Sequence, residues 1–212
     1  KRVFSYLIKG HQCYFDSERK KFNKGIDYCL NELPKIKKLI STNQFNKNVE
    51  KIHCKIKPIF IFGVPRCGST LIEKVIASGA NRIPIGEETS IFGNLVRQKI
   101  YEKQELNSNI INFRTKLIKE YNQKGLIQEK SNYVFTDKSL DNFFYIGLIR
   151  EAFPYAKMID CRRNALSSIM SILKNNLIEI SWAHTLKHIF KYLDIYYETV
   201  ESYKKIFPNF IY

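Results

Sequence analysis

The sequence lacks any run of 18 or more apolar residues, so it predicts no segment that crosses a bilayer. Its first residues hold no apolar core of the kind that a secretory signal needs. Cysteine is scarce and odd in number, with five residues and no C-x-x-C pair. This pattern argues against a disulfide framework and favours free thiols in a reducing, cytoplasmic compartment.

Methionine is absent from the first position, and the chain stops in an apolar run, so we expect a piece of a longer protein. A metal site is not expected either. His11 with Cys13 and His53 with Cys54 are the nearest candidates, and their spacings match no zinc-ligand pattern.

Acidic residues are few compared with basic ones. There are 35 Lys and Arg against 20 Asp and Glu, a formal net charge of +15 over 212 residues. Such an excess favours an anionic partner, such as a nucleic acid, a phosphorylated small molecule or an acidic polymer. The alternative is a lysine-rich solvated surface without a specific partner.

Short β-prone runs alternate with helical apolar stripes, a pattern typical of an α/β fold with a parallel sheet flanked by helices. The predicted strands are 58–62, 133–136 and 156–160, and the predicted helices are 71–79, 140–153, 166–177 and 183–205. In such a sheet ligands bind at the carboxyl ends of the strands.

The chain divides into two predicted parts. Residues 1–55 are rich in Lys and Asn and predict a helical extension with a loop at 41–48. Residues 56–212 carry the α/β pattern, interrupted by the polar segment 98–132, which we expect to form helix, then loop, and to cover a site.

The segment 63–70, G-V-P-R-C-G-S-T, follows an apolar strand and opens an amphipathic helix. This context is typical of a loop that binds phosphate with backbone amides and a helix N-terminus. It is not a Walker A loop, because Ser69 occupies the position of the lysine and the cation is Arg66, inside the loop. A nucleoside-phosphate kinase is therefore a weak alternative.

A second basic element follows the third predicted strand. Arg162 and Arg163 end that strand, and Ser167, Ser171 and Lys174 share one face of the next helix. A guanidinium and a hydroxyl placed in this way can bind a second phosphate.

The loop P-R-C-G-S-T-L at 65–71 resembles the P-[RK]-S-G-[ST]-T-L/W loop of sulfotransferases, which binds the phosphosulfate of 3′-phosphoadenosine 5′-phosphosulfate (PAPS). The resemblance implies the sulfotransferase fold, PAPS as cosubstrate and no required metal. Cys67 departs from the usual Ser and removes a hydroxyl, although its backbone amide remains. The residues implied to bind the phosphosulfate are Arg66, Cys67, Gly68, Ser69 and Thr70.

The resemblance also assigns the other end of PAPS. In the family an Arg at a strand end and a Ser eight residues later hold the 3′-phosphate, and Arg163 and Ser171 have that spacing. Lys174 joins them as a binding residue on the same helix face.

Catalytic roles are implied for two further segments. The G-E-E-T at 86–89 is similar to a segment of protein-tyrosine sulfotransferases, which makes Glu88 the first candidate for the base. Glu87 is the second candidate, because the spacing from Arg66 is one residue longer than the family pattern. The D-K at 137–138 is similar to the family's D-K or N-K, so Lys138 joins Arg66 as a cation near the leaving group.

The stretch 137–176 looks closest to bacterial sulfotransferases linked to tetratricopeptide repeats, and residues 4–10 resemble the end of their helical region. The expected reaction is sulfuryl transfer from PAPS to a hydroxyl of a protein tyrosine, a carbohydrate or a small molecule, with an acidic peptide or carbohydrate as partner. A basic nucleic-acid binder is the alternative from another class, and the absence of a base-stacking motif weighs against it.

Overall fold

The computed structural model describes residues 2–36, 55–79, 82–101, 110–127 and 133–212. Its centre is a three-stranded sheet in the order β2-β1-β3. β1 (Ile59–Gly63) pairs in parallel with β2 (Thr136–Asp137) and with β3 (Lys157–Cys161). The predicted α/β fold is confirmed, and all three strands lie close to their predicted positions.

Backbone pairing continues beyond these bounds. The amide of Lys57 donates to the carbonyl of Tyr133 at 2.7 Å. The second predicted strand, 133–136, is therefore paired with the β1 side of the sheet from Tyr133 onward, before β2 itself begins. On the other side of the sheet, Ile211 forms a parallel bridge with Met158, and the amide of Asp160 donates to the carbonyl of Tyr212 at 2.9 Å. The end of the chain therefore lies along β3 as a further extended segment.

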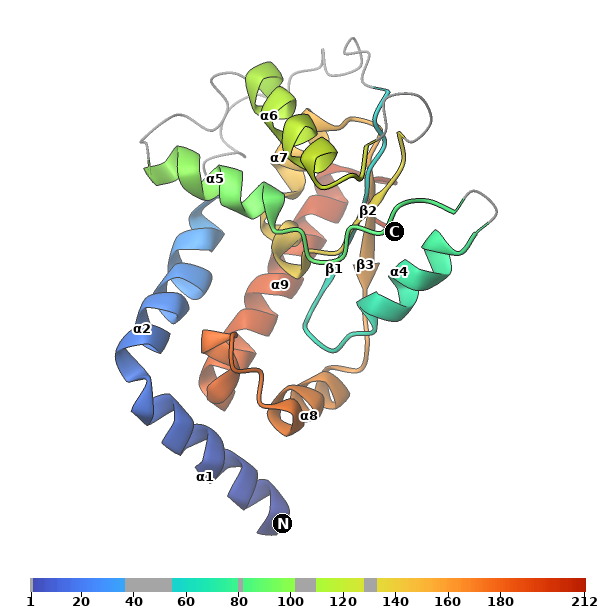
Figure 1. Cartoon of the computed structure of the whole chain (residues 1–212). Helices are drawn as coiled ribbons and strands as arrows, with labels where there is room; N and C mark the ends of the chain where they lie inside the picture. Colours follow the sequence, from blue (N-terminus) through green and yellow to red (C-terminus); the bar gives the residue numbers. More distant parts are fainter. Residues whose placement is uncertain (1, 37–54, 80–81, 102–109, 128–132) are drawn as a thin grey trace.

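Helices surround this sheet, and β1 is buried among them. In Figure 1, α4 lies on the opposite side of the strands from α5. The side chains of Phe60 and Phe62 on β1 have no exposed surface. The helices that follow β1 in the chain are α4 (Ser69–Ala77), α5 (Ile91–Tyr101), α6 (Ile110–Gln123), α7 (Ile146–Ala152), α8 (Ala165–Asn175) and α9 (Leu186–Ile206).

The helix predicted at 140–153 is two elements. A 3-10 helix, η3 (Leu140–Tyr145), precedes α7, which ends before Pro154 as expected. Phe143, Phe144 and Tyr145 are all buried, and a 3-10 turn directs three consecutive side chains in three different directions.

The apolar face predicted for α4 lies in solvent. Leu71 is 67% exposed and Val75 is 60% exposed, whereas the carboxylate-bearing Glu73 is 1% exposed. The buried side of α4 consists of Ser69, Glu73 and Ala77, which are spaced four residues apart. The polar residue that faces inward belongs to the functional site described below.

In α9 the buried face is largely aromatic. Tyr192, Tyr196 and Tyr203 are buried there together with apolar residues of the predicted stripe. Phe190 lies outside this buried face, because it is half exposed.

The predicted helical N-terminal extension is present. It comprises α1 (Arg2–Ser17), α2 (Arg19–Asp27) and the π-helix η1 (Tyr28–Glu32), which contact α8, α9 and the 3-10 helix η4 (Ser181–His184). The His11 ring bonds the carbonyl of Leu173 through Nε2 at 2.8 Å, and its Nδ1 lies 3.1 Å from Nδ1 of His184. The loop predicted at 41–48 lies outside the described residues, and the domain boundary at residue 55 stays a prediction.

Candidate functional site

The loop between β1 and α4 has the backbone that an anion-binding turn needs. Gly68 is the N-cap of α4 and has a left-handed φ of 102°, a conformation that glycine adopts without strain. Arg66 also has a positive φ, 72°, which a residue with a side chain rarely adopts. The first turn of α4 leaves backbone N–H groups without helical partners, and they supply donors at this point.

The second basic element lies at the same edge of the sheet. Gly63, the last residue of β1, is in register with Cys161, the last residue of β3. The Nε of Arg66 donates a hydrogen bond of 3.2 Å to Oγ of Ser171 on α8. The structure thus brings together an arginine and a serine that the sequence assigned to opposite ends of one ligand.

The two arginines after β3 have different surroundings. Arg162 forms ion pairs with Asp160 and Glu201, which hold it against α9. Arg163 is exposed and has no ion-pair partner within the described part of the chain. Arg163 is therefore the one of the two whose charge is available to a ligand, and its role in binding the 3′-phosphate stays a prediction.

The two elements border a hollow of about 620 Å3, which we call the loop hollow. Its walls include the predicted residues Arg66, Gly68, Ser69, Thr70, Glu88 and Arg163, together with Pro65, Leu71, Lys74, Leu140, Leu177 and Ile180. Lys74 was not predicted, although its spacing of four from Thr70, about one helical turn, is a signal that could have found it. Lys174 is exposed on α8 and lies outside this lining, so its binding role stays a prediction.

Glu88, which lines the hollow, forms an ion pair with Lys138, which lies behind it and outside the lining. Nζ of Lys138 lies 2.9 Å from Oε1 of Glu88; the lysine side chain is 6% exposed and the glutamate side chain is 62% exposed. Glu87 is exposed and is absent from the lining, while its carbonyl accepts from the amide of Lys138 at 2.7 Å. Of the two candidate bases, Glu88 is the one that reaches the hollow.

Asp137 organises the turn that carries this lysine. The carboxylate has no exposed surface, and it accepts hydrogen bonds from the hydroxyls of Thr89 and Tyr121 and from the amide of Ser139 and the side chain of Asn142. Four donors satisfy a buried charge that would otherwise be costly. The sequence indicates this residue only as part of the D-K pair, because Thr89 and Tyr121 are distant from it in the chain.

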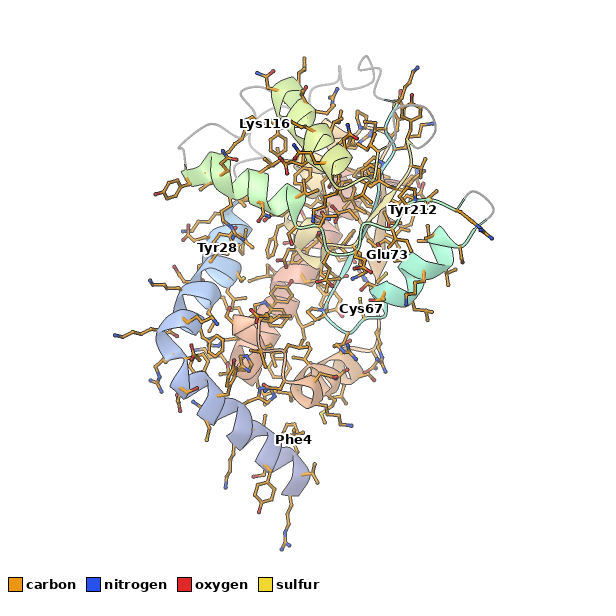
Figure 2. The ribbon with its side chains drawn as sticks, in the orientation of Figure 1. Phe4, Tyr28, Cys67, Glu73, Lys116 and Tyr212 are labelled. Carbon is orange, nitrogen blue, oxygen red and sulfur yellow. The ribbon has the colours of Figure 1, made fainter. Side chains whose placement is uncertain are left out.

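Glu73 is a second buried carboxylate that sequence reasoning missed. Its Oε1 accepts from the amide of Glu87 at 3.1 Å and from the hydroxyl of Thr136 at 2.7 Å. It thereby ties α4 to both the G-E-E-T segment and the end of β2, as its position in Figure 2 illustrates. The inward face of α4 is polar because it anchors these loops.

Cys67, labelled in Figure 2, lies in the loop between β1 and α4. It lines a small space together with Cys161 and does not line the loop hollow. A Cβ on Gly63 would lie 2.7 Å from Sγ of Cys67, so the thiol occupies space that only a glycine leaves open. A hydrogen bond from the Cys161 side chain, helped by the amide and hydroxyl of Ser69, lowers the pKa of the Cys67 thiol to about 6.

A second pocket of about 240 Å3, the inner pocket, adjoins the loop hollow. Pro65, Glu88, Leu140 and Ile180 line both spaces. The inner pocket also contains Arg97 and Asp141, which the sequence analysis did not single out because neither belongs to a recognisable motif.

The described residues include neither a membrane-spanning helix nor a metal-ligand cluster. No helix among them is long and apolar enough to cross a membrane. They also contain no group of three or more His, Cys, Asp or Glu side chains placed to hold a metal ion.

Comparison with known proteins gives two matches. A model described as the sulfotransferase family matches residues 58–210. An uncharacterized protein of Aquifex aeolicus (strain VF5) is 30% identical over 174 residues, which is 76% of this chain and 23% of that protein. The chain thus spans less than a quarter of the length of this curated relative. The family match includes the sheet, both basic elements and the Glu88–Lys138 pair, and the chain belongs to the sulfotransferase family.

Proposed function

We propose that the chain transfers a sulfuryl group from PAPS to a hydroxyl acceptor. The hydrogen bond between Arg66 and Ser171 is the observation that carries this proposal. It joins the loop after β1 to the helix after β3, so that two anion-binding elements border one hollow. PAPS has an anionic group at each end, and sulfotransferases generally use it as donor.

The charges of the loop hollow fit this donor. Among the described lining residues, Arg66, Lys74 and Arg163 are cations, and Glu88 is the single carboxylate. The amides of the loop and of the first turn of α4 would bind the phosphosulfate, together with the hydroxyls of Ser69 and Thr70. Arg163 and Ser171 would bind the 3′-phosphate.

The proposed reaction is an in-line displacement at sulfur. The acceptor oxygen bonds to sulfur while the bond from sulfur to the bridging phosphate oxygen breaks, and the acceptor proton passes to Glu88. The leaving product is 3′-phosphoadenosine 5′-phosphate (PAP). Lys138 has three N–H donors, so it can hold Glu88 and stabilise the leaving phosphate oxygen at the same time, next to Arg66.

We also propose the narrower family assignments that the sequence motifs imply. The likeness to enzymes linked to tetratricopeptide repeats and to protein-tyrosine sulfotransferases rests on sequence motifs alone. The described cysteines, Cys13, Cys29, Cys67 and Cys161, are free thiols, which supports the expected cytoplasmic location. No feature of the described residues favours the nucleic-acid or kinase alternative over sulfuryl transfer.

The test is transfer of label from PAPS to a panel containing a tyrosine peptide and simple glycosides. Removing the base by Glu88→Gln should lower kcat by about a hundredfold or more. Glu87→Gln is the matched control and should stay within about threefold of the original rate, because that side chain lies outside the hollow. Full activity of Glu88→Gln would show that the assigned base is wrong.

A further inference from the structure

The inner pocket stands next to the proposed donor site and has no assigned ligand. Glu88 lines both spaces, so a molecule in the inner pocket would meet the proposed base directly. A volume of about 240 Å3 is below the usual range of roughly 300–1,000 Å3 for drug-sized ligands. The pocket therefore has room for a single ring of an acceptor.

One wall of this pocket comes from outside the region that matches the family. Tyr28, Cys29 and Leu33 of the N-terminal helical extension line it, opposite residues of α5 and η3. The family match begins only at residue 58. The N-terminal extension therefore supplies part of the pocket wall.

The inner pocket and the loop hollow differ in charge. Among the described residues that line the inner pocket, Glu88, Asp141 and Glu179 carry carboxylates, and Arg97 is the single cation. The Arg97 guanidinium donates to the Tyr28 hydroxyl at 3.2 Å and lies over its ring, 4.8 Å from the centroid. Because Glu88 is paired with Lys138, Asp141 and Glu179 against Arg97 leave one negative charge in excess among the described lining residues.

Asp141 is the carboxylate that η3 contributes to the pocket. It accepts a hydrogen bond of 3.0 Å from the hydroxyl of Tyr192, and its side chain remains accessible through the pocket. Burial raises the pKa of its carboxyl group, while Tyr192 and Arg97 oppose this rise. A further negative charge placed beside Asp141 would be strongly disfavoured.

The remaining polar groups of the pocket suit a ligand with several hydroxyls. Ser90, Asn94 and Ser181 line it together with the three carboxylates. A phenol ring offers one polar atom and would leave most of these groups without hydrogen-bond partners. Polar groups left unpaired in this way weaken the binding of the ligand. A sugar ring offers hydroxyls around its whole edge.

We infer that the inner pocket binds one uncharged, polyhydroxylated ring of the acceptor, a neutral sugar unit, and that Asp141 and Glu179 select against acidic acceptors. This inference rests on the proposed function, because it takes Glu88 as the base that the acceptor hydroxyl meets. It favours the carbohydrate acceptor over the acidic peptide, both of which the sequence left open.

The experiment compares p-nitrophenyl β-glucoside with p-nitrophenyl β-glucuronide, which differ by a hydroxymethyl group and a carboxylate. With the full chain and PAPS, kcat/KM for the glucoside should exceed that for the glucuronide by about tenfold or more, because like charges oppose each other in the pocket. A peptide with aspartates flanking a tyrosine should be the poorest acceptor of the three.

Charge-removing variants separate selection from catalysis. In the Asp141→Asn/Glu179→Gln double variant, the ratio between glucoside and glucuronide should fall by about threefold or more, mainly through KM for the glucuronide. Glu198→Gln, on the exposed part of α9, is the matched control and should leave the ratio unchanged. Equal use of both glycosides by the original chain, or preference for the acidic acceptors, would overturn the inference.

Binding measurements distinguish failure of this inference from failure of the proposed function. If PAP binds, but neither glycoside is sulfated nor shows saturation-transfer NMR contacts with the protein, the sugar assignment is wrong and the donor site stands. If the full chain does not bind PAP, the proposed function fails and the inference fails with it. An unchanged ratio in the double variant would show that Asp141 and Glu179 do not select the acceptor.

Discussion

At the scale of the residue, Cys67 shows how one substitution changes a phosphate-binding loop. The family pattern has a serine there, and the sequence alone indicates only the loss of a hydroxyl donor. In the structure the thiol lies against Cys161 at the end of β3 and does not line the loop hollow. The amide of Cys67 donates to the carbonyl of Val64 at 3.1 Å, so the position contributes a hydrogen bond that closes the turn and a thiol beneath the loop.

The reactivity of Cys67 is the first prediction. Because its pKa is lowered to about 6, the fraction of reactive thiolate should rise around pH 6 and level off by about pH 7. An unperturbed thiol would continue to gain reactivity beyond pH 8. The measurement is the rate of alkylation by iodoacetamide at this peptide from pH 5 to 9, followed by mass spectrometry.

Two controls accompany this measurement. Cys161→Ser removes the neighbouring thiol and should alter the midpoint of the Cys67 profile, whereas Cys13→Ser, an exposed position on α1, should not. A midpoint near pH 8.5 in the original chain would contradict the proposed interaction between the two thiols.

At the scale of the element, α4 links the phosphate loop to the base-bearing segment. Its N-terminus faces the hollow, and one turn later Glu73 holds the backbone of Glu87 and the side chain of Thr136. The position of Glu88 therefore depends on α4, a helix whose outer apolar face is exposed within the described part of the chain.

Glu73 provides the second prediction. Glu73→Leu leaves a buried amide and a buried hydroxyl without an acceptor and should lower the free energy of unfolding by about 1–3 kcal/mol. It should also lower kcat more than PAP affinity, because it displaces Glu88 while the loop remains. Glu73→Gln keeps one carbonyl oxygen and should be milder in both respects. Chemical denaturation and labelled-PAPS kinetics measure the two effects, and equal losses in the two variants would argue against this role.

The sequence predicted the elements whose pattern is local. Three such patterns each lie within a short segment: the strand 58–62, the glycine-containing turn after it, and the spacing of Arg163 and Ser171. In the structure the turn and the arginine–serine element meet at the carboxyl ends of the parallel strands. The sequence did not predict the roles of Glu73, Asp137 and Asp141. Each has at least one partner about 50 or more residues away or, for Asp137, 48 and 16 residues away in Thr89 and Tyr121, and a local sequence pattern does not identify such contacts.

At the scale of the whole molecule, the N-terminal helices pack against the α/β part through a histidine pair. His11 on α1 and His184 on η4 are both buried, and His11 also bonds the end of α8. Burial and the neighbouring His11 lower the pKa of His184 to about 4. The neutral ring is thus the form that fits this contact.

This contact gives the third prediction. A histidine with a folded-state pKa near 4 and an unfolded value near 6.5 contributes stability that is complete above pH 6.5 and is lost as the pH falls toward 4. We expect the loss from this group to be roughly 1–2 kcal/mol at pH 4.5, or a few degrees in Tm. Thermal unfolding from pH 7.5 to 4.5 measures it, with His184→Phe as the variant that cannot titrate at this position. Identical pH profiles for the two proteins would contradict the assignment.

The whole molecule also separates charge between two adjoining spaces. Arg66, Lys74 and Arg163 line the loop hollow, while carboxylates prevail in the inner pocket, and Glu88 stands between them. The net charge of +15 therefore does not describe the site. Under the proposed function, the cationic space would bind the anionic donor and the acidic space would bind a neutral acceptor.

The central claim is that both basic elements bind one molecule, and isothermal titration with PAP tests it most directly. The full chain should bind one PAP, and Arg66→Ala and Arg163→Ala should each weaken binding by about tenfold or more, because each removes a charged hydrogen-bond donor. Arg82→Ala, an exposed arginine outside the loop hollow, should bind PAP as the original chain does. Absence of PAP binding by the original chain, or undiminished binding by Arg163→Ala, would contradict the account.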